Sequence, residues 1–240
     1  MRASTPADPI TPIQPTDISL NSILPAIELS TNNDPTTSVI WLHGLGADGN
    51  DFVPVVKELN LPEDKPIRFI FPHAPMRPVT LNAGYVMRAW YDIGMAAGQL
   101  TTKEEDVRIS QKAIEMLIER EVERGTPTEK IILAGFSQGG VIALQTGLRY
   151  PKKLGGILAL STYLALANSL SAERSEVNAS ISIYMAHGLQ DPIVPLTMAT
   201  RSRDELKRLG YQVEWHDYPM QHSVCMEEIE SISAWLQRLV

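Results

Sequence analysis

One stretch, residues 130–140, constrains the fold of this chain more than any other, because a β-branched apolar run ends there in a glycine-flanked serine. The run Ile131-Ile132-Leu133-Ala134 predicts a buried strand. It is followed by Gly135-Phe136-Ser137-Gln138-Gly139 and then by apolar residues at helical spacing. A strand, a sharp turn and a helix are the context that a G-x-S-x-G nucleophile elbow requires. We therefore predict that Ser137 lies on a strained turn, with its hydroxyl above the edge of a sheet.

Composition narrows the class of protein. The chain has 240 residues, 44% hydrophobic and 20% charged, which is ordinary for one globular α/β domain. Its formal net charge of −7 disfavours nucleic acid or an anionic membrane surface as the main partner. The single cysteine, Cys225, excludes an internal disulfide and is typical of a reducing compartment. Since no export signal or spanning segment is recognised, we expect a cytoplasmic protein without stable membrane insertion.

Strands and helices alternate along most of the chain. This order predicts an α/β fold with a mostly parallel central sheet and helices on both faces. Residues 1–20 are rich in proline and are interpreted as a flexible leader, while residues 21–240 are interpreted as a single domain. Residues 72–102 have weak periodicity and are interpreted as a long functional loop. Thr101 or Thr102 is predicted to cap the helix that follows this loop.

The glycines of Gly44-Leu45-Gly46-Ala47-Asp48-Gly49 match the G-x-G-x-x-G pattern of dinucleotide-binding proteins. That pattern also needs its third glycine inside the opening helix and an acid near the end of the second strand. Asn50-Asp51 instead predicts a helix cap after Gly49. The next strand, Ile67–Phe71, ends in Pro72-His73-Ala74-Pro75 without an acid. We therefore reject a dinucleotide site.

Three reactive side chains follow predicted strands, which is where ligands bind in doubly wound sheets. They are Ser137, Asp191 and His222, and they occur in the chain order of an α/β-hydrolase triad. In this interpretation His222 accepts the serine proton, and Asp191 orients the imidazole and stabilises its cation. Asp217 is nearer to His222 in sequence, but it is predicted to lie in or at the end of a strand. We therefore prefer Asp191 as the acid.

An oxyanion formed at Ser137 would need two backbone donors. One is expected at Gln138, directly after the nucleophile, and the other at Leu45, in the loop after the first core strand. His43 and His187 each precede a glycine at a strand end and are expected to be hydrogen-bonded supports rather than bases. No H-E-x-x-H or comparable spacing occurs, so no metal site is expected.

Several other motifs occur together with the elbow. They are WLHGLGADG at 41–49, PHAPMRPVT at 72–80, AWYDI at 89–93, GFSQGG at 135–140, HGLQDPIVP at 187–195 and YPMQH at 218–222. This set resembles the carboxylesterase / acyl-protein thioesterase / lysophospholipase family of α/β-hydrolases, and is most similar to its bacterial carboxylesterases. The resemblance covers roughly residues 39–240.

The resemblance implies a serine hydrolase that cleaves short- to medium-chain carboxylic esters through an acyl-enzyme, without a cofactor, and possible homodimer formation. By motif position it assigns the nucleophile, acid and base to Ser137, Asp191 and His222, and the oxyanion donors to Leu45 and Gln138. It also implies that the Trp90-Tyr91-Asp92 loop forms a wall of the acyl site. The apolar candidates for substrate binding are Trp90, Met95, Leu164 and Ile193, together with Leu45.

Alternative functions remain open from the sequence. An acyl-protein thioesterase or lysophospholipase that acts on longer acyl chains would use the same triad, so only the pocket and surface would discriminate. A catalytically silent binding module of the same fold would have no need of the three triad residues together. A dienelactone-hydrolase-like enzyme generally has a cysteine nucleophile, which position 137 lacks.

Overall fold

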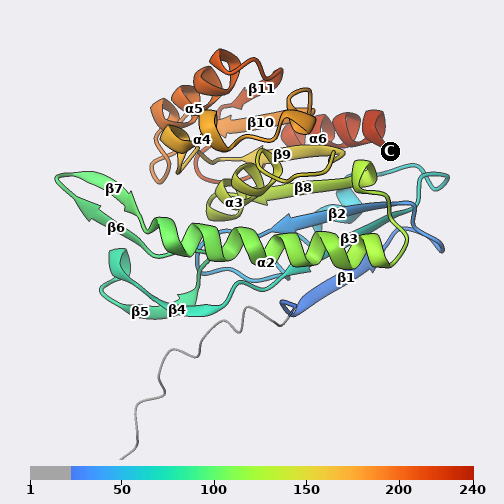
Figure 1. Cartoon of the computed structure of the whole chain (residues 1–240), viewed down its shortest axis with the longest axis horizontal. Helices are drawn as coiled ribbons and strands as arrows, with labels where there is room; N and C mark the ends of the chain where they lie inside the picture. The colour runs from blue at the N-terminus through green and yellow to red at the C-terminus, as the bar shows by residue number, and fades with distance from the viewer. Residues whose placement is uncertain (1–22) are drawn as a thin grey trace, which may run out of the picture.

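The computed structural model describes residues 23–240, so the leader predicted over residues 1–20 lies outside the described residues. A seven-stranded sheet has the strand order β1-β3-β2-β8-β9-β10-β11 (Figure 1). Within it, β1 pairs antiparallel at one edge and the other strands are parallel, which confirms the predicted mostly parallel sheet. The bounds are β1 Ala26–Ser30, β2 Thr37–Leu42, β3 Ile67–Pro72, β8 Ile131–Phe136, β9 Gly156–Leu160, β10 Ile183–Gly188 and β11 Val213–Tyr218.

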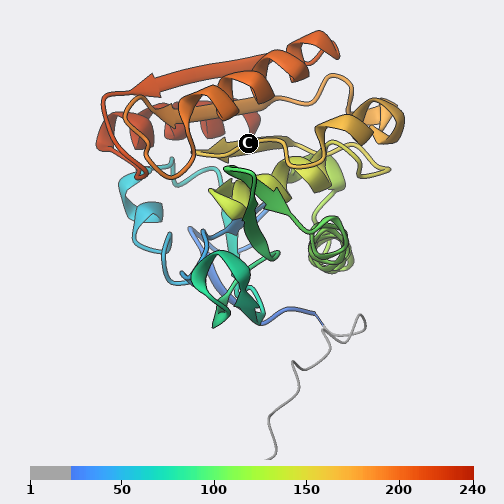
Figure 2. The ribbon, with the colours of Figure 1, turned by 90° about the vertical axis from the view of Figure 1, so that its left-hand side faces the viewer.

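Helices cover both faces of the sheet, and Figure 2 shows α2 and α6 on opposite sides of it. Alternate residues of β2 enter two separate cores, Ile40 on one face and Trp41 on the other. In residues 23–240 no helix has both the length and the apolar character needed to cross a bilayer. The helices are α1 Val55–Glu58, α2 Glu104–Glu123, α3 Gln138–Gly147, α4 Ala167–Glu173, α5 Leu196–Arg208 and α6 Met226–Leu239.

Residues 72–102 form two β-hairpins rather than one irregular loop. The first pairs β4 (Met76–Val79) with β5 (Tyr85–Arg88), and the second pairs β6 (Ile93–Ala96) with β7 (Gln99–Thr102). Both hairpins lie at the end of the molecule toward which β2 and β8 point (Figure 1). Each strand has four residues, too few for a clear alternation in the sequence. The predicted helix cap is also wrong, because Thr101 and Thr102 belong to strand β7, which pairs with β6. The N-cap position of α2 is occupied by Lys103.

The first helix is shorter than predicted, because α1 spans only Val55–Glu58. Tight turns precede it, in which for example the Asp51 N–H donates to the Asp48 carbonyl at 3.1 Å. The helix begins after Pro54, which lacks an N–H and has a fixed φ suited to a helix start. Asn50-Asp51 is therefore not the cap of a regular helix.

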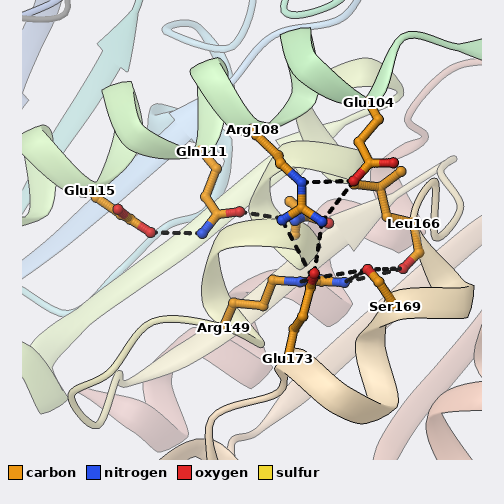
Figure 3. A network of polar contacts seen from close by, with 9 residues as sticks. Glu104, Arg108, Gln111, Glu115, Arg149, Leu166, Ser169 and Glu173 are labelled. Carbon is orange, nitrogen blue, oxygen red and sulfur yellow. Dashed lines mark hydrogen bonds and ion pairs between the residues drawn. The ribbon is translucent and has the colours of Figure 1, made fainter.

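A network of charged side chains joins α2, α3 and α4 (Figure 3). Arg108 of α2 and Arg149, just after α3, each donate to the carboxylate of Glu173 in α4, both at 2.7 Å. Arg149 also donates to the carbonyl of Leu166 at 3.1 Å, ahead of α4. Hydrogen bonds from Arg108, Arg149 and Ser169 lower the pKa of Glu173 to about 2, against the opposing effect of burial. The network thus fixes α4, and the segment before it, against α2 and α3.

We expect this network to make stability depend on pH. Because the pKa of Glu173 is lowered in the folded state, its stabilisation is present above its ordinary value of 4.5 and is lost as the pH falls toward 2. The carboxylate is partly exposed, so Glu173→Gln should lower the free energy of unfolding at pH 7 by only about 1 kcal/mol. Denaturant unfolding from pH 3 to 7 measures the difference, which should shrink at the acid end.

The matched control is Glu230→Gln, on the exposed face of α6, where the carboxylate has no ion pair within residues 23–240. It should change the free energy of unfolding by less than about 0.5 kcal/mol at either pH. A Glu173→Gln variant as stable as the native protein at pH 7 would contradict the role given to the network.

Candidate active site

The chain makes a sharp elbow at Ser137, where β8 ends and α3 begins. Ser137 has φ 54° and ψ −119°, a conformation that residues with a Cβ rarely adopt. Two hydrogen bonds hold the turn. The Ser137 N–H donates to the Leu160 carbonyl at 2.9 Å, and Thr162 Oγ1 donates to the Ser137 carbonyl at 2.7 Å. The structure therefore places Ser137 on the strained turn that its flanking sequence predicts.

Two glycines of the motif allow backbone to meet backbone at this elbow. A Cβ on Gly139 would lie 2.3 Å from the carbonyl oxygen of Leu42, at the end of β2. A Cβ on Gly135 would lie 2.3 Å from the carbonyl group of Gly139 itself. No side chain fits at such distances without moving the main chain. The spacing of the motif is therefore required by the close approach of α3 to β2 and β8.

Asp191 and His222 come together from the loops that follow β10 and β11. Nδ1 of His222 donates to Asp191 Oδ2 at 2.7 Å. The other carboxylate oxygen accepts the amides of Ile193 and Val194, at 2.8 and 2.9 Å. Asp191 is buried and His222 is partly exposed. The carboxylate thus fixes the imidazole with its proton on Nδ1, which leaves Nε2 free to accept one.

A glycine also brings these two loops together. A Cβ on Gly188, the last residue of β10, would lie 2.3 Å from the carbonyl oxygen of Gln221. The Asp217 carboxylate, the alternative acid, lies on β11 and instead accepts a hydrogen bond from Trp215 Nε1 at 3.1 Å. The structure therefore places Asp191, and not Asp217, against His222.

A second histidine contacts the buried carboxylate. Nε2 of His187 donates to the Val194 carbonyl at 2.8 Å and lies 3.4 Å from Asp191 Oδ2. Burial lowers the pKa of His187, so the ring is neutral at physiological pH. Its place agrees with the supporting role expected from the sequence, since it holds the turn that carries Asp191.

Two residues predicted to supply backbone amides line the same cavity as the serine. Leu45, in the loop after β2, and Gln138, the first residue of α3, line one cavity with Ser137 and His222. Within residues 23–240, neither the Leu45 nor the Gln138 amide donates to a protein acceptor. Gln138 is also at the positive end of the α3 dipole. Both amides are therefore available to an oxygen that becomes negatively charged.

A neutral histidine and a buried tryptophan brace the loop that carries Leu45. His43 Nδ1 donates to the Gly44 carbonyl at 2.7 Å, and its Nε2 accepts the Ala74 amide at 3.0 Å. Burial lowers the pKa of His43 to about 4, which keeps this tautomer neutral and both bonds in place. The indole of Trp90 donates to the His43 carbonyl at 2.8 Å. The bracing preorganises the loop rather than contributing a reactive group.

A cavity of about 260 Å³ opens beside Ser137 and His222. Most of its wall is apolar or aromatic, drawn from both hairpins and from the loops after β9 and β10. These residues are Leu45, Leu81, Tyr91, Ile93, Leu100, Phe136, Tyr163, Ile193 and Val194.

Of the five apolar residues predicted to bind substrate, Leu45 and Ile193 line this cavity and the other three lie elsewhere. Trp90 is fully buried and packs behind the loop, while its neighbour Tyr91 faces the cavity. Met95 is 61% exposed on β6, and Leu164 lines a separate groove between α4 and α5. Sequence reasoning found the loop but chose the wrong one of two adjacent aromatic residues.

The cavity wall also contains residues that sequence reasoning missed, among them Leu100 and Tyr163. In the sequence these two residues were marked only by their apolar or aromatic character, because the segments that contain them have weak periodicity. No group of three or more His, Cys, Asp or Glu side chains that could hold a metal occurs in the described part of the chain.

The sequence is similar to known proteins along nearly its whole length. The family model described as Phospholipase/Carboxylesterase matches residues 25–240. The chain belongs to the phospholipase/carboxylesterase family. Among curated relatives, acyl-protein thioesterase 1 of Neurospora crassa is 40% identical over 84% of this chain and 86% of its own. Acyl-protein thioesterase 1 of Gibberella zeae is 38% identical over 85% of this chain and 90% of its own.

Solved structures show that this family member has the α/β-hydrolase fold. Arabidopsis thaliana SOBER1 is 32% identical with a TM-score of 0.78, covering 84% of this chain and 98% of its own. Zea mays acyl-protein thioesterase 2 is 27% identical with a TM-score of 0.79, covering 90% and 98%. The Bacillus cereus carboxylesterase, at 16% identity and a TM-score of 0.68 over 92% and 96%, shows the fold alone. The expected closeness to bacterial carboxylesterases is therefore wrong, since the fungal thioesterases are far more similar.

The packing at the elbow makes a prediction about glycine. Gly139→Ala places a Cβ against the Leu42 carbonyl and should destabilise the protein by about 3 kcal/mol or more. The matched control is Gly84→Ala, in the turn between β4 and β5, where φ is +79° and no atom lies within 4 Å of the added Cβ. It should show only conformational strain, about 1 kcal/mol. Denaturant unfolding compares the two, and equal losses would contradict the steric argument.

Proposed function

We propose that this protein is a serine hydrolase that removes acyl groups from ester and thioester substrates, with S-acylated cysteine side chains as its preferred class. The observation that carries the proposal is the meeting of Ser137, the His222–Asp191 pair and two free amides around one mostly apolar cavity. Relatives at 38–40% identity named acyl-protein thioesterase 1 favour the thioester as the bond that is cleaved.

In the proposed mechanism, Ser137 Oγ attacks the substrate carbonyl carbon and its proton passes to Nε2 of His222. The imidazolium is stabilised by the Asp191 carboxylate at Nδ1. The carbonyl oxygen becomes an oxyanion that accepts from the Leu45 and Gln138 amides. When the tetrahedral intermediate collapses, the carbon–sulfur or carbon–oxygen bond breaks, and His222 supplies the proton to the leaving group.

Deacylation repeats the same chemistry with water as the nucleophile. His222 accepts a proton from water as it attacks the acyl-serine carbonyl, and the Ser137–acyl bond breaks to release the carboxylic acid. The proton then returns to Ser137 Oγ. All the groups that this cycle requires belong to the chain itself, and the apolar wall of the cavity binds the acyl chain.

A carboxylesterase of short- to medium-chain esters is the second candidate, because its chemistry would use the same residues. The modest volume of the cavity, about 260 Å³, favours it over a lysophospholipase that accepts long chains. Thioester and oxygen ester substrates of equal acyl length therefore distinguish the two candidates.

The central test compares an S-octanoyl cysteine peptide with 4-nitrophenyl octanoate. The native protein should cleave both, with a higher kcat/KM for the peptide, and Ser137→Ala should lose about 10⁴–10⁶-fold in kcat on each. Thiol release and 4-nitrophenol absorbance report the two reactions. Cleavage of the ester alone would replace the thioesterase by the carboxylesterase. No cleavage by a folded protein would favour the silent binding module.

The acid can be tested independently. Asp191→Asn should lower kcat about 10³–10⁴-fold, because an amide can no longer stabilise the imidazolium or enforce the tautomer. Asp217→Asn is the matched control on the neighbouring strand, and it should stay within about twofold of the native kcat. Similar losses in both variants, measured on 4-nitrophenyl octanoate, would contradict the assignment of Asp191.

A further inference from the structure

Tyr163 stands between two hollows of the molecule. On one side it lines the cavity that holds Ser137 and His222. On the other it lines a groove of about 210 Å³ between α4 and α5, together with Leu164, Ala167 and Met198. Of the described residues, Tyr163 is the one that borders both hollows. Tyr163, which is 7% exposed, therefore lies at the boundary between them.

Hydrogen bonds fix Tyr163 on the cavity side. The hydroxyl of Tyr163 lies 3.2 Å from that of Tyr91, which also lines the cavity, and 3.4 Å from Thr102 Oγ1 on β7. The three hydroxyl groups satisfy one another where the wall would otherwise bury unpaired polar atoms. These contacts join the loop after β9 to the base of the β6–β7 hairpin, and they fix the position of the Tyr163 ring.

The backbone on the groove side is fixed as well. The Leu164 amide donates to Ser202 Oγ of α5 at 2.9 Å, and the Leu166 carbonyl accepts from Arg149 at 3.1 Å. Ahead of the ring, Thr162 bonds to the carbonyl of Ser137. The backbone on both sides of Tyr163 is therefore fixed by hydrogen bonds. A substitution of Tyr163 would remove its side chain from the wall and leave these backbone contacts in place.

We propose that Tyr163 is a specificity-determining residue that sets the longest acyl chain the site accepts, an inference that rests on the proposed function. An engineered apolar cavity of about 150 Å³ in another protein binds benzene, so 260 Å³ has room for an acyl chain of roughly eight to ten carbons. A longer chain meets the Tyr163 ring. Removing the ring would join the cavity to the groove, where Leu164, Ala167 and Met198 offer apolar surface beside the polar residues Arg201, Ser202 and Glu205.

The experiment measures kcat/KM on 4-nitrophenyl esters with acyl chains of 4 to 16 carbons. In the native protein kcat/KM should rise to about ten carbons and then fall. In Tyr163→Ala it should go on rising, since each newly buried methylene is worth about fourfold. The ratio of the 16-carbon to the 8-carbon ester should increase at least tenfold. Tyr163→Phe keeps the ring and loses the hydroxyl, so its length limit should remain native.

A second substitution tests whether the groove receives the chain. Ala167→Phe, placed at the start of α4, should refill the groove in the Tyr163→Ala protein and restore the native limit. Thermal unfolding establishes that each variant is folded, and Tyr163→Leu, which also shortens the side chain, replaces the alanine variant if that one is not.

The outcomes separate the two proposals. One outcome is that the native protein is active in a way that depends on Ser137 while folded Tyr163→Ala or Tyr163→Leu keeps the native length limit. That result overturns the role of Tyr163 and leaves the proposed function standing. A longer limit that Ala167→Phe does not reverse overturns the passage into the groove. A folded native protein inactive on every ester and thioester overturns the proposed function itself, and this inference with it.

Discussion

The arrangement of the site depends on one contact, the close approach of the first turn of α3 to the end of β2 at Gly139. With no side chain at that position, the carbonyl of Leu42 lies where a Cβ would be. The contact places the first amide of α3 beside the loop that follows β2, so that Gln138 and Leu45 line the same cavity. A Cβ at this position would force the main chain of α3 and that of β2 apart. The shared position of these two amides is thus a consequence of backbone packing.

Strand order explains why residues distant in sequence meet. Asp191 and His222 are 31 residues apart in sequence. They meet because β10 and β11 are neighbouring parallel strands, so the loops that follow them leave the sheet at the same place, the carboxyl ends of the strands. Gly188 lets those loops touch, and the amides of Ile193 and Val194 take up one oxygen of the carboxylate. The other oxygen is left for the imidazole. The buried acid is therefore oriented by main chain and needs no cation beside it.

The groups that follow strand ends could be predicted from the sequence, and the walls of the cavity could not. The elbow at Ser137 is encoded within five residues, and the sheet order makes the ends of successive parallel strands converge. Trp90 and Tyr91, by contrast, are adjacent aromatic residues of similar character. Tertiary contacts distinguish the two rings: the Trp90 indole donates to the His43 carbonyl, and the Tyr91 hydroxyl lies against that of Tyr163. Leu164 was chosen in place of its neighbour Tyr163 for the same reason, since Tyr163 lines the cavity and Leu164 lines only the α4–α5 groove.

The segment that hydrogen-bonds to the turn at Ser137 also forms part of the cavity wall. Thr162 bonds to the carbonyl of Ser137, and the next residue carries the ring between the cavity and the α4–α5 groove. Ser161, buried with φ 46°, begins this turn directly after β9. This one short turn makes the hydrogen bond to Ser137 and also carries Tyr163. The position of the cavity wall relative to the serine is therefore set by two consecutive residues, Thr162 and Tyr163. The wall at Tyr163 is thus held by the same hydrogen-bonded backbone that holds the elbow.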